Sequence, residues 1–163
     1  AYQESLETLS GLRAGFLCDA LQFDARFFGI ADEEGFYMDP QQRLFLEAVW
    51  HTVEDAGYGP GSLAGSNTGI FVGVGKNEYI GLLKDFEINM ISKYIGTGHA
   101  ISGVANRASY ALDVHGPSET IATACSSSLV AIHRAVQALK YQECELAIAG
   151  GVNLLFSPYS FLV

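Results

Sequence analysis

One short stretch decides how this sequence folds: residues 121–131 read Ile-Ala-Thr-Ala-Cys-Ser-Ser-Ser-Leu-Val-Ala, with the cysteine at position 125. A short apolar run precedes the cysteine, and apolar residues at helical spacing follow it. The pattern predicts a strand over residues 119–124 and a helix over residues 126–141. Cys125 therefore stands at a predicted strand-to-helix junction.

A cysteine in that place has two interpretations on the residues alone. The start of a helix presents free N–H groups and a partial positive charge, which favour the nucleophilic thiolate and can stabilise an oxyanion. Free cysteines are also commonly buried, where they act as small apolar side chains. Cys125 is thus a candidate nucleophile, and a structural role is an equal alternative at this point.

The rest of the chain alternates helices with strands. Residues 1–14 resemble a weak helix and residues 77–96 are ambiguous, whereas the clearer predictions are a helix over 39–56, a strand over 68–75, a helix over 99–112 and a strand over 146–156. Such alternation predicts an α/β layered fold with a mostly parallel sheet.

Helix boundaries and buried faces can also be predicted. Asp39 can cap the helix over 39–56, with Pro40 at its first position and Gln42 in the reciprocal position of a capping box. Apolar spacing also predicts which side chains of the three helices are buried. They are Leu44, Ala48, Val49, Val53 and Ala56 in the helix over 39–56; Ile101, Val104, Ala105, Ala108 and Leu112 in the helix over 99–112; and Leu129, Ile132, Val136 and Leu139 in the helix over 126–141.

Composition excludes several function classes. A net charge of −9 argues against nucleic-acid binding, although a local basic patch for an acidic partner stays open from Arg26, Arg43, Lys76, Lys84 and Lys93. Three widely spaced cysteines predict a reducing compartment, and no basic-then-apolar signal segment opens the chain, so we expect the cytoplasm. No apolar run reaches the roughly 18 residues of a membrane span, and no zinc-ligand spacing is present.

The stretch TACSSS at 123–128 resembles the active-site signature of β-ketoacyl synthases of the polyketide synthase type. Other segments resemble the same family in the same order: FDARFFGI at 23–30, MDPQQR at 38–43, GIFVG at 69–73, NRASY at 106–110, GPS at 116–118 and AGGVN at 149–153. One departure is Ala122, where the family usually has an aspartate; it puts local hydrogen bonding in doubt rather than the reaction class.

The resemblance implies a thiolase-like fold of two similar α/β halves. Residues 1–163 would then be an incomplete N-terminal half of a ketosynthase domain, without a first strand that we expect to be central in the sheet. We therefore expect the isolated chain to be unstable and inactive. The resemblance also implies a homodimer joined through the edge strand at residues 118–124.

For the chemistry, the resemblance implies that Cys125 accepts an acyl chain from the phosphopantetheine thioester of an acyl carrier protein. A malonyl-type extender is then decarboxylated, and its carbanion attacks the Cys125 thioester. Two histidines that the family supplies downstream assist this step, and no cofactor is bound by the segment. We carry over none of His51, His99, His115 and His133 to that role.

Three alternatives stay open. A ketosynthase that transfers chains without extending them, or another thiolase-fold acyltransferase, would keep Cys125. A cysteine hydrolase would use His99 or His115 as its base. A non-catalytic scaffold or dimerisation segment would not react with acyl thioesters at all.

Overall fold

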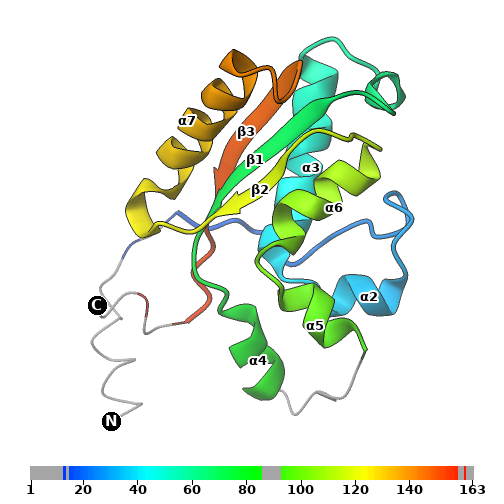
Figure 1. The fold of residues 1–163 in the computed structure, drawn as a ribbon. Coiled ribbons are helices and arrows are strands. Elements are labelled where there is room, and N and C mark those ends of the chain that lie inside the picture. The colour runs from blue at the N-terminus through cyan, green and yellow to red at the C-terminus, as the bar shows by residue number, and fades with distance from the viewer. Residues whose placement is uncertain (1–12, 14, 86–92, 158–159, 161–163) are drawn as a thin grey trace.

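A parallel sheet between two layers of helices forms the centre of the molecule (Figure 1). The computed structural model describes residue 13, residues 15–85, residues 93–157 and residue 160. Strands β1 (Thr68–Val74), β2 (Ser118–Ile121) and β3 (Leu146–Val152) lie in the order β2-β1-β3. Helix α7 (Ser127–Lys140) covers one face, and α3 (Pro40–Asp55) and α6 (Gly103–Ala111) cover the other. The α/β layered fold expected from the sequence is thereby confirmed.

Shorter elements connect these layers. They are α2 (Asp32–Tyr37), the 3-10 turn η1 (Pro60–Leu63), α4 (Tyr79–Asp85), α5 (Tyr94–His99) and the 3-10 turn η2 (Ala124–Ser126). Helix α4 and the first residues of α5 lie within residues 77–96, whose sequence pattern is ambiguous. The weak helix expected over residues 1–14 falls almost wholly outside the described residues.

Strand β1 is the centre of the sheet, and every one of its residues is buried. It pairs in parallel with β2 from Ile70–Ser118 to Gly73–Ile121, and with β3 from Thr68–Leu146 to Val74–Val152. Since β1 is hydrogen-bonded on both sides, no place is open in the middle of this sheet. A further strand can therefore add only beside β2 or β3, and the place of the first strand of the domain in a longer sheet stays a prediction.

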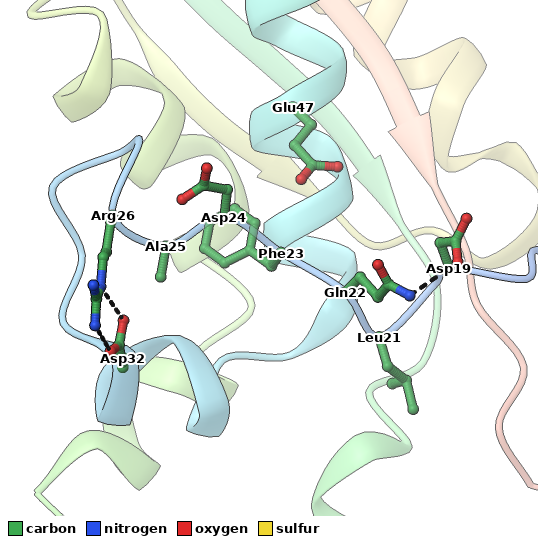
Figure 2. Close-up of a pocket in the computed structure, with 9 residues that line it drawn as sticks. All are labelled: Asp19, Leu21, Gln22, Phe23, Asp24, Ala25, Arg26, Asp32 and Glu47. Atoms are coloured by element: carbon green, nitrogen blue, oxygen red, sulfur yellow. Dashed lines mark hydrogen bonds and ion pairs between the residues drawn. The ribbon is translucent and has the colours of Figure 1, made fainter.

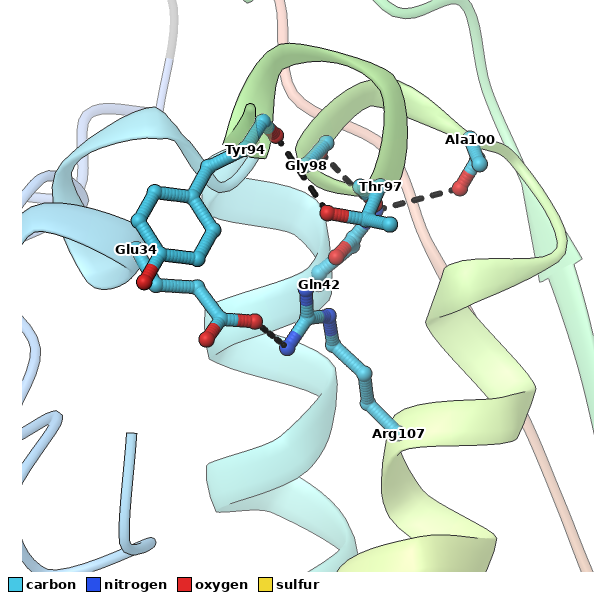
Figure 3. Close-up of polar contacts among 7 residues, drawn as sticks. All are labelled: Glu34, Gln42, Tyr94, Thr97, Gly98, Ala100 and Arg107. Carbon is cyan, nitrogen blue, oxygen red and sulfur yellow. Dashed lines mark hydrogen bonds and ion pairs between the residues drawn. The ribbon is translucent and has the colours of Figure 1, made fainter. Parts of the chain in front are cut away.

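At the start of α3, the N-cap predicted at Asp39 is confirmed, whereas the capping-box role predicted for Gln42 is wrong. The Asp39 carboxylate accepts a hydrogen bond from the Gln41 backbone N–H at 2.8 Å, and Pro40 is the first helical residue. Gln42 does not complete a capping box. Its buried amide donates instead to the carbonyls of Gly98 at 2.9 Å and Ala100 at 3.1 Å, which fastens α5 to α3 (Figure 3).

Charged side chains around this helix are paired rather than free. Arg43 is buried and donates to the backbone carbonyls of Met38, Leu21 and Phe36, so it cannot belong to a surface basic patch. A mostly buried ion pair of 2.7 Å between Glu34 and Arg107 joins α2 to α6 (Figure 3).

Replacing Asp39 with alanine is expected to loosen the first turn of α3. A lost N-cap costs about 1 kcal/mol, and sometimes about 2, which corresponds to about five- to thirtyfold faster local opening. Amide hydrogen exchange of the peptide over residues 40–44 measures this local opening. The exposed Asp55→Ala, at the other end of the same helix, serves as the control, and equal exchange in both variants would contradict the capping role.

The buried side of α7 differs from the prediction. Leu129, Ile132, Val136 and Leu139 are between 41% and 73% exposed, whereas the side facing the sheet consists of Ala131, Ala135 and Ala138. The helix packs so close to β1 and β3 that only small side chains fit between them. The large apolar residues therefore face away from the sheet.

Other boundaries moved by a few residues. The helix over 99–112 begins only at Gly103, and Ile101 is 46% exposed, although Val104, Ala105, Ala108 and Leu112 are buried as expected. In α3 the buried apolar residues are Phe45, Leu46, Val49 and Val53 rather than Leu44, Ala48 or Ala56. Strand β3 ends at Val152, and residues 153–157 continue as an irregular segment.

Candidate active site

Cys125 lies between the end of β2 and the start of α7, as the sequence predicts. Its side chain is exposed among the described residues, which does not favour the alternative of a buried structural cysteine. The preceding residue, Ala124, has a φ of 55°, a left-handed conformation that costs energy for a residue with a Cβ atom. This sharp turn presents Cys125 at the amino end of α7.

The hydroxyl groups of the two serines after the cysteine hold the turn. The buried Ser127 hydroxyl accepts a hydrogen bond from the Thr123 backbone N–H at 2.9 Å and donates to the Ala124 carbonyl at 2.7 Å. Ser126 donates to the Thr123 carbonyl at 2.8 Å. The serines after Cys125 thus fix the strained backbone, a role that the sequence analysis did not assign to them.

Two glycines allow α7 to begin directly against the sheet. Gly73 in β1 and Gly151 in β3 are register partners. A Cβ atom on Gly73 would lie 2.5 Å from the carbonyl carbon of Ser127 and from the nitrogen of Ser128. One on Gly151 would clash with the Ser128 hydroxyl. The position of Cys125 therefore depends on having glycine, which has no side chain, at these two positions in the strands beneath it.

A pocket of about 740 Å³ opens beside the Cys125 thiol. Its walls come from the carboxyl ends of the strands, where ligands commonly bind in α/β sheets. Its lining residues are Gly73, Val74, Gly75, Lys76, Ile101, Ala122, Ala124, Cys125, Ser127, Ser128, Gly151, Val152, Asn153, Leu155 and Ser160. Most of these side chains are small or apolar, so the pocket suits a largely apolar substituent.

The surroundings of Cys125 favour nucleophilic chemistry. A helix of 14 residues starts two positions after it, and its N-terminal N–H groups carry partial positive charge. Such charge stabilises a thiolate and the oxyanion that forms when a thiolate attacks a carbonyl. An exposed thiol with this support and an adjacent apolar pocket can form a covalent thioester.

No histidine is among the described residues that line this pocket. His115 pairs with Asp113 at 3.3 Å, and its backbone N–H bonds to Ser66 at the amino end of β1. The Nδ1 atom of His99 lies 3.3 Å from the Asn77 amide, and burial lowers the pKa of this histidine. His51 lies within 3.5 Å of Glu54, and His133 is exposed on α7. The described lining of the pocket thus lacks the histidine base, His99 or His115, that the hydrolase alternative requires.

A second, larger hollow of about 910 Å³ runs along residues 19–26 (Figure 2). Four of its nine lining residues are acidic, and burial raises the pKa of one of them, Glu47. Its arginine, Arg26, is engaged with Asp32 at 2.7 Å. Its lining residues include no thiol or hydroxyl side chain, so it offers no counterpart to the Cys125 thiol for accepting an acyl group.

Metal and membrane sites receive no support from the described residues. No three His, Cys, Asp or Glu side chains in this part of the chain are grouped to hold a metal ion. Nor does any helix within the described ranges have the length and apolar character needed to cross a bilayer.

Comparisons with known proteins agree with this geometry. The family described as "Beta-ketoacyl synthase, N-terminal domain" matches residues 3–163. The chain is 51% identical over 148 residues to the pikromycin polyketide synthase component PikAII of Streptomyces venezuelae, and 48% identical over 143 residues to the 6-methylsalicylic acid synthase of Aspergillus niger. These matches cover 91% and 88% of this chain, but only 4% and 8% of those much longer relatives.

Solved structures show the same relationship. The ketosynthase from module 6 of the bacillaene synthase of Bacillus subtilis 168 aligns with a TM-score of 0.79 and 38% identity, over 91% of this chain and 24% of that one. An oxazolomycin ketosynthase domain from Streptomyces albus aligns with the same TM-score and 39% identity, over 91% of this chain and 26% of that one. The fold is therefore part of the thiolase-like fold of ketosynthases, and the chain belongs to the β-ketoacyl synthase family, as a partial N-terminal segment of a polyketide synthase ketosynthase domain.

Proposed function

We propose that Cys125 is the nucleophile of a condensing enzyme in polyketide biosynthesis. Its thiolate attacks the carbonyl carbon of an acyl thioester carried on the phosphopantetheine of an acyl carrier protein. The tetrahedral oxyanion collapses, the C–S bond to the pantetheine breaks, and the pantetheine sulfur takes a proton. The acyl chain is then held on the Cys125 sulfur.

The observation that carries this proposal is the placement of Cys125. An exposed thiol stands on a strained turn, at the amino end of α7, beside a pocket of about 740 Å³ with mostly small and apolar walls. The N–H groups of the helix terminus support the oxyanion, and the apolar walls accept the acyl chain.

Condensation is the second stage of the proposal. A malonyl-type extender on a carrier protein loses CO₂, and its α-carbon attacks the Cys125 thioester, which releases the thiolate and leaves a chain longer by two backbone carbons. By resemblance to the family, two histidines downstream of this chain assist that step. Within the chain, Cys125 and the helix terminus provide the acyl-binding half of the machinery.

We infer that this activity belongs to a longer polypeptide. The large apolar residues Leu129, Ile132, Val136 and Leu139 lie exposed on α7, and this chain covers only 24% of the solved bacillaene ketosynthase. An exposed apolar face of this kind marks a contact surface, and the remainder of the ketosynthase domain is its proposed occupant. The isolated segment is accordingly expected to be inactive.

The proposed partners follow from the same resemblance. Strand β2 is an edge strand of the described sheet, as a homodimer joined through residues 118–124 requires. The second partner is an acyl carrier protein, with phosphopantetheine as the carrier of substrate rather than a resident cofactor. All three cysteines are free thiols, in keeping with a cytoplasmic enzyme.

A two-stage assay on the longest natural polypeptide that contains this segment tests the function. The protein is first loaded with an acyl N-acetylcysteamine thioester, and a malonyl-loaded carrier protein is then added. A carrier protein whose mass corresponds to a β-ketoacyl group lengthened by two carbons supports condensation. Transfer of the unlengthened acyl group to a carrier protein with a free phosphopantetheine thiol, with no β-ketoacyl product on the malonyl-loaded carrier, would indicate the transacylating alternative. No transfer to either carrier would indicate the scaffold alternative.

A further inference from the structure

A carboxylate outside the Cys125 turn holds one wall of the pocket. The irregular segment over residues 153–157 contributes Asn153 and Leu155 to the pocket lining, and Ser160 also lines the pocket. Glu78, between β1 and α4, accepts hydrogen bonds from the backbone N–H groups of Phe156 and Ser157, both at 2.9 Å. Its other oxygen accepts from the Ser160 hydroxyl.

The Glu78 carboxylate thus accepts hydrogen bonds from three donors in the same wall of the pocket. Hydrogen bonds to a carboxylate are stronger than those between neutral groups. Burial raises the pKa of Glu78, but the bonds from Ser160, Ser157 and Phe156 outweigh it and leave the pKa below its ordinary value. Glu78 is therefore ionised at neutral pH, and its carboxylate accepts these three hydrogen bonds as a charged group.

Contacts of residues near Glu78 also hold Leu154 and Phe156 in place. The ring of Tyr79, the next residue, lies 6.2 Å from the ring of Phe156. Gln41, at the start of α3, accepts from the Leu154 backbone N–H at 3.4 Å and donates to the Lys76 carbonyl at 3.1 Å. The segment is thus fastened on both sides of Leu155, which lines the pocket.

We propose that Glu78 is a positioning residue that fixes residues 154–157 and Ser160 as a wall of the pocket and thereby sets which acyl chains Cys125 accepts. The inference rests on the proposed acylation of Cys125. Glu78 is not among the residues that line the pocket, so it acts through the backbone that carries Leu155. Discrimination between chains comes from how closely an apolar wall fits them.

The test compares Glu78→Ala and Glu78→Gln with wild type in the full ketosynthase-containing polypeptide. The rate constant of Cys125 acylation is measured as a function of concentration for acetyl and hexanoyl N-acetylcysteamine. The ratio of the two specificity constants is expected to change about tenfold in Glu78→Ala, the size of effect that apolar pocket contacts exert. Glu78→Asp, which keeps the charge, is expected to retain part of the wild-type ratio.

Glu145→Ala is the matched control, because this exposed glutamate lies at the amino end of β3, away from the pocket. It is expected to leave the ratio unchanged. Amide hydrogen exchange over residues 154–157 is expected to be faster in the Glu78 variants and not in the control. If Glu78→Ala does not fold, Glu78→Gln, which keeps one acceptor oxygen, provides the same comparison.

The outcomes separate this inference from the proposed function. Acylated wild type with a changed ratio in the Glu78 variants supports the inference. Acylated wild type with the same ratio in every variant, or a uniform fall for both thioesters, overturns it and leaves the proposed function standing. Absence of any adduct in folded wild type overturns the proposed function and the inference together.

Discussion

Replacing Cys125 with alanine is expected to lower acyl transfer and condensation by at least about a thousandfold. The thiol is the only group proposed to bond to the acyl chain, and alanine removes it without changing the backbone turn at Ala124. The fold should persist, because the Cys125 side chain is exposed and contributes little to the core. Steady-state rates of β-ketoacyl formation and the amplitude of single-turnover acylation measure the effect.

Cys18→Ala is the matched control, since Cys18 is also an exposed free thiol in the described part of the chain. It is expected to keep wild-type rates. If Cys125→Ala retained acyl transfer while Cys18→Ala lost it, the assignment of the nucleophile would be wrong.

Replacing Gly73 with alanine is expected to displace the start of α7 and with it Cys125. The new Cβ would lie 2.5 Å from the Ser127 carbonyl carbon and 2.8 Å from its oxygen, which are backbone atoms that cannot rotate away. Overpacking of this kind costs about 1–3 kcal/mol. Relief requires the start of α7 to move off the sheet and Cys125 to move with it. A displacement of about 1 Å can lower the rate about a hundredfold.

Gly96→Ala provides the comparison for this effect. Gly96 lies in α5 and has open space where the new Cβ atom would be, and alanine favours a helix over glycine by about 0.5–1 kcal/mol. Denaturant unfolding and the acylation rate are measured for both variants. Equal stability and equal rates for Gly73→Ala and Gly96→Ala would contradict the role given to the close contact between β1 and α7.

Features set by neighbouring residues were predictable from the sequence. Asp39 caps α3 because its carboxylate reaches an N–H two residues away, and the apolar run at residues 68–75 became the buried strand β1. The junction at Cys125 was predicted because the change from strand to helix pattern occurs within a few residues. The family resemblance of the surrounding segments was confirmed by the comparisons.

Features set by distant contacts were not predictable. Spacing alone placed Leu129 and Ile132 toward the sheet, but the approach of α7 to Gly73 and Gly151 leaves room only for its alanines. Gln42 bonds to carbonyls more than 50 residues away instead of to its own cap. The contacts of Glu78 with Phe156 and Ser157 likewise span nearly half of the chain, and no local pattern indicates them.

The most direct test of the account is to find where an acyl group becomes attached. The longest natural polypeptide containing this segment is incubated with an acyl N-acetylcysteamine thioester, and intact mass is followed by peptide mapping. One acyl group is expected on the peptide that contains Cys125, and none in Cys125→Ala. A folded protein that gains no adduct with any of several acyl chains, or gains it on another residue, would contradict the central claim.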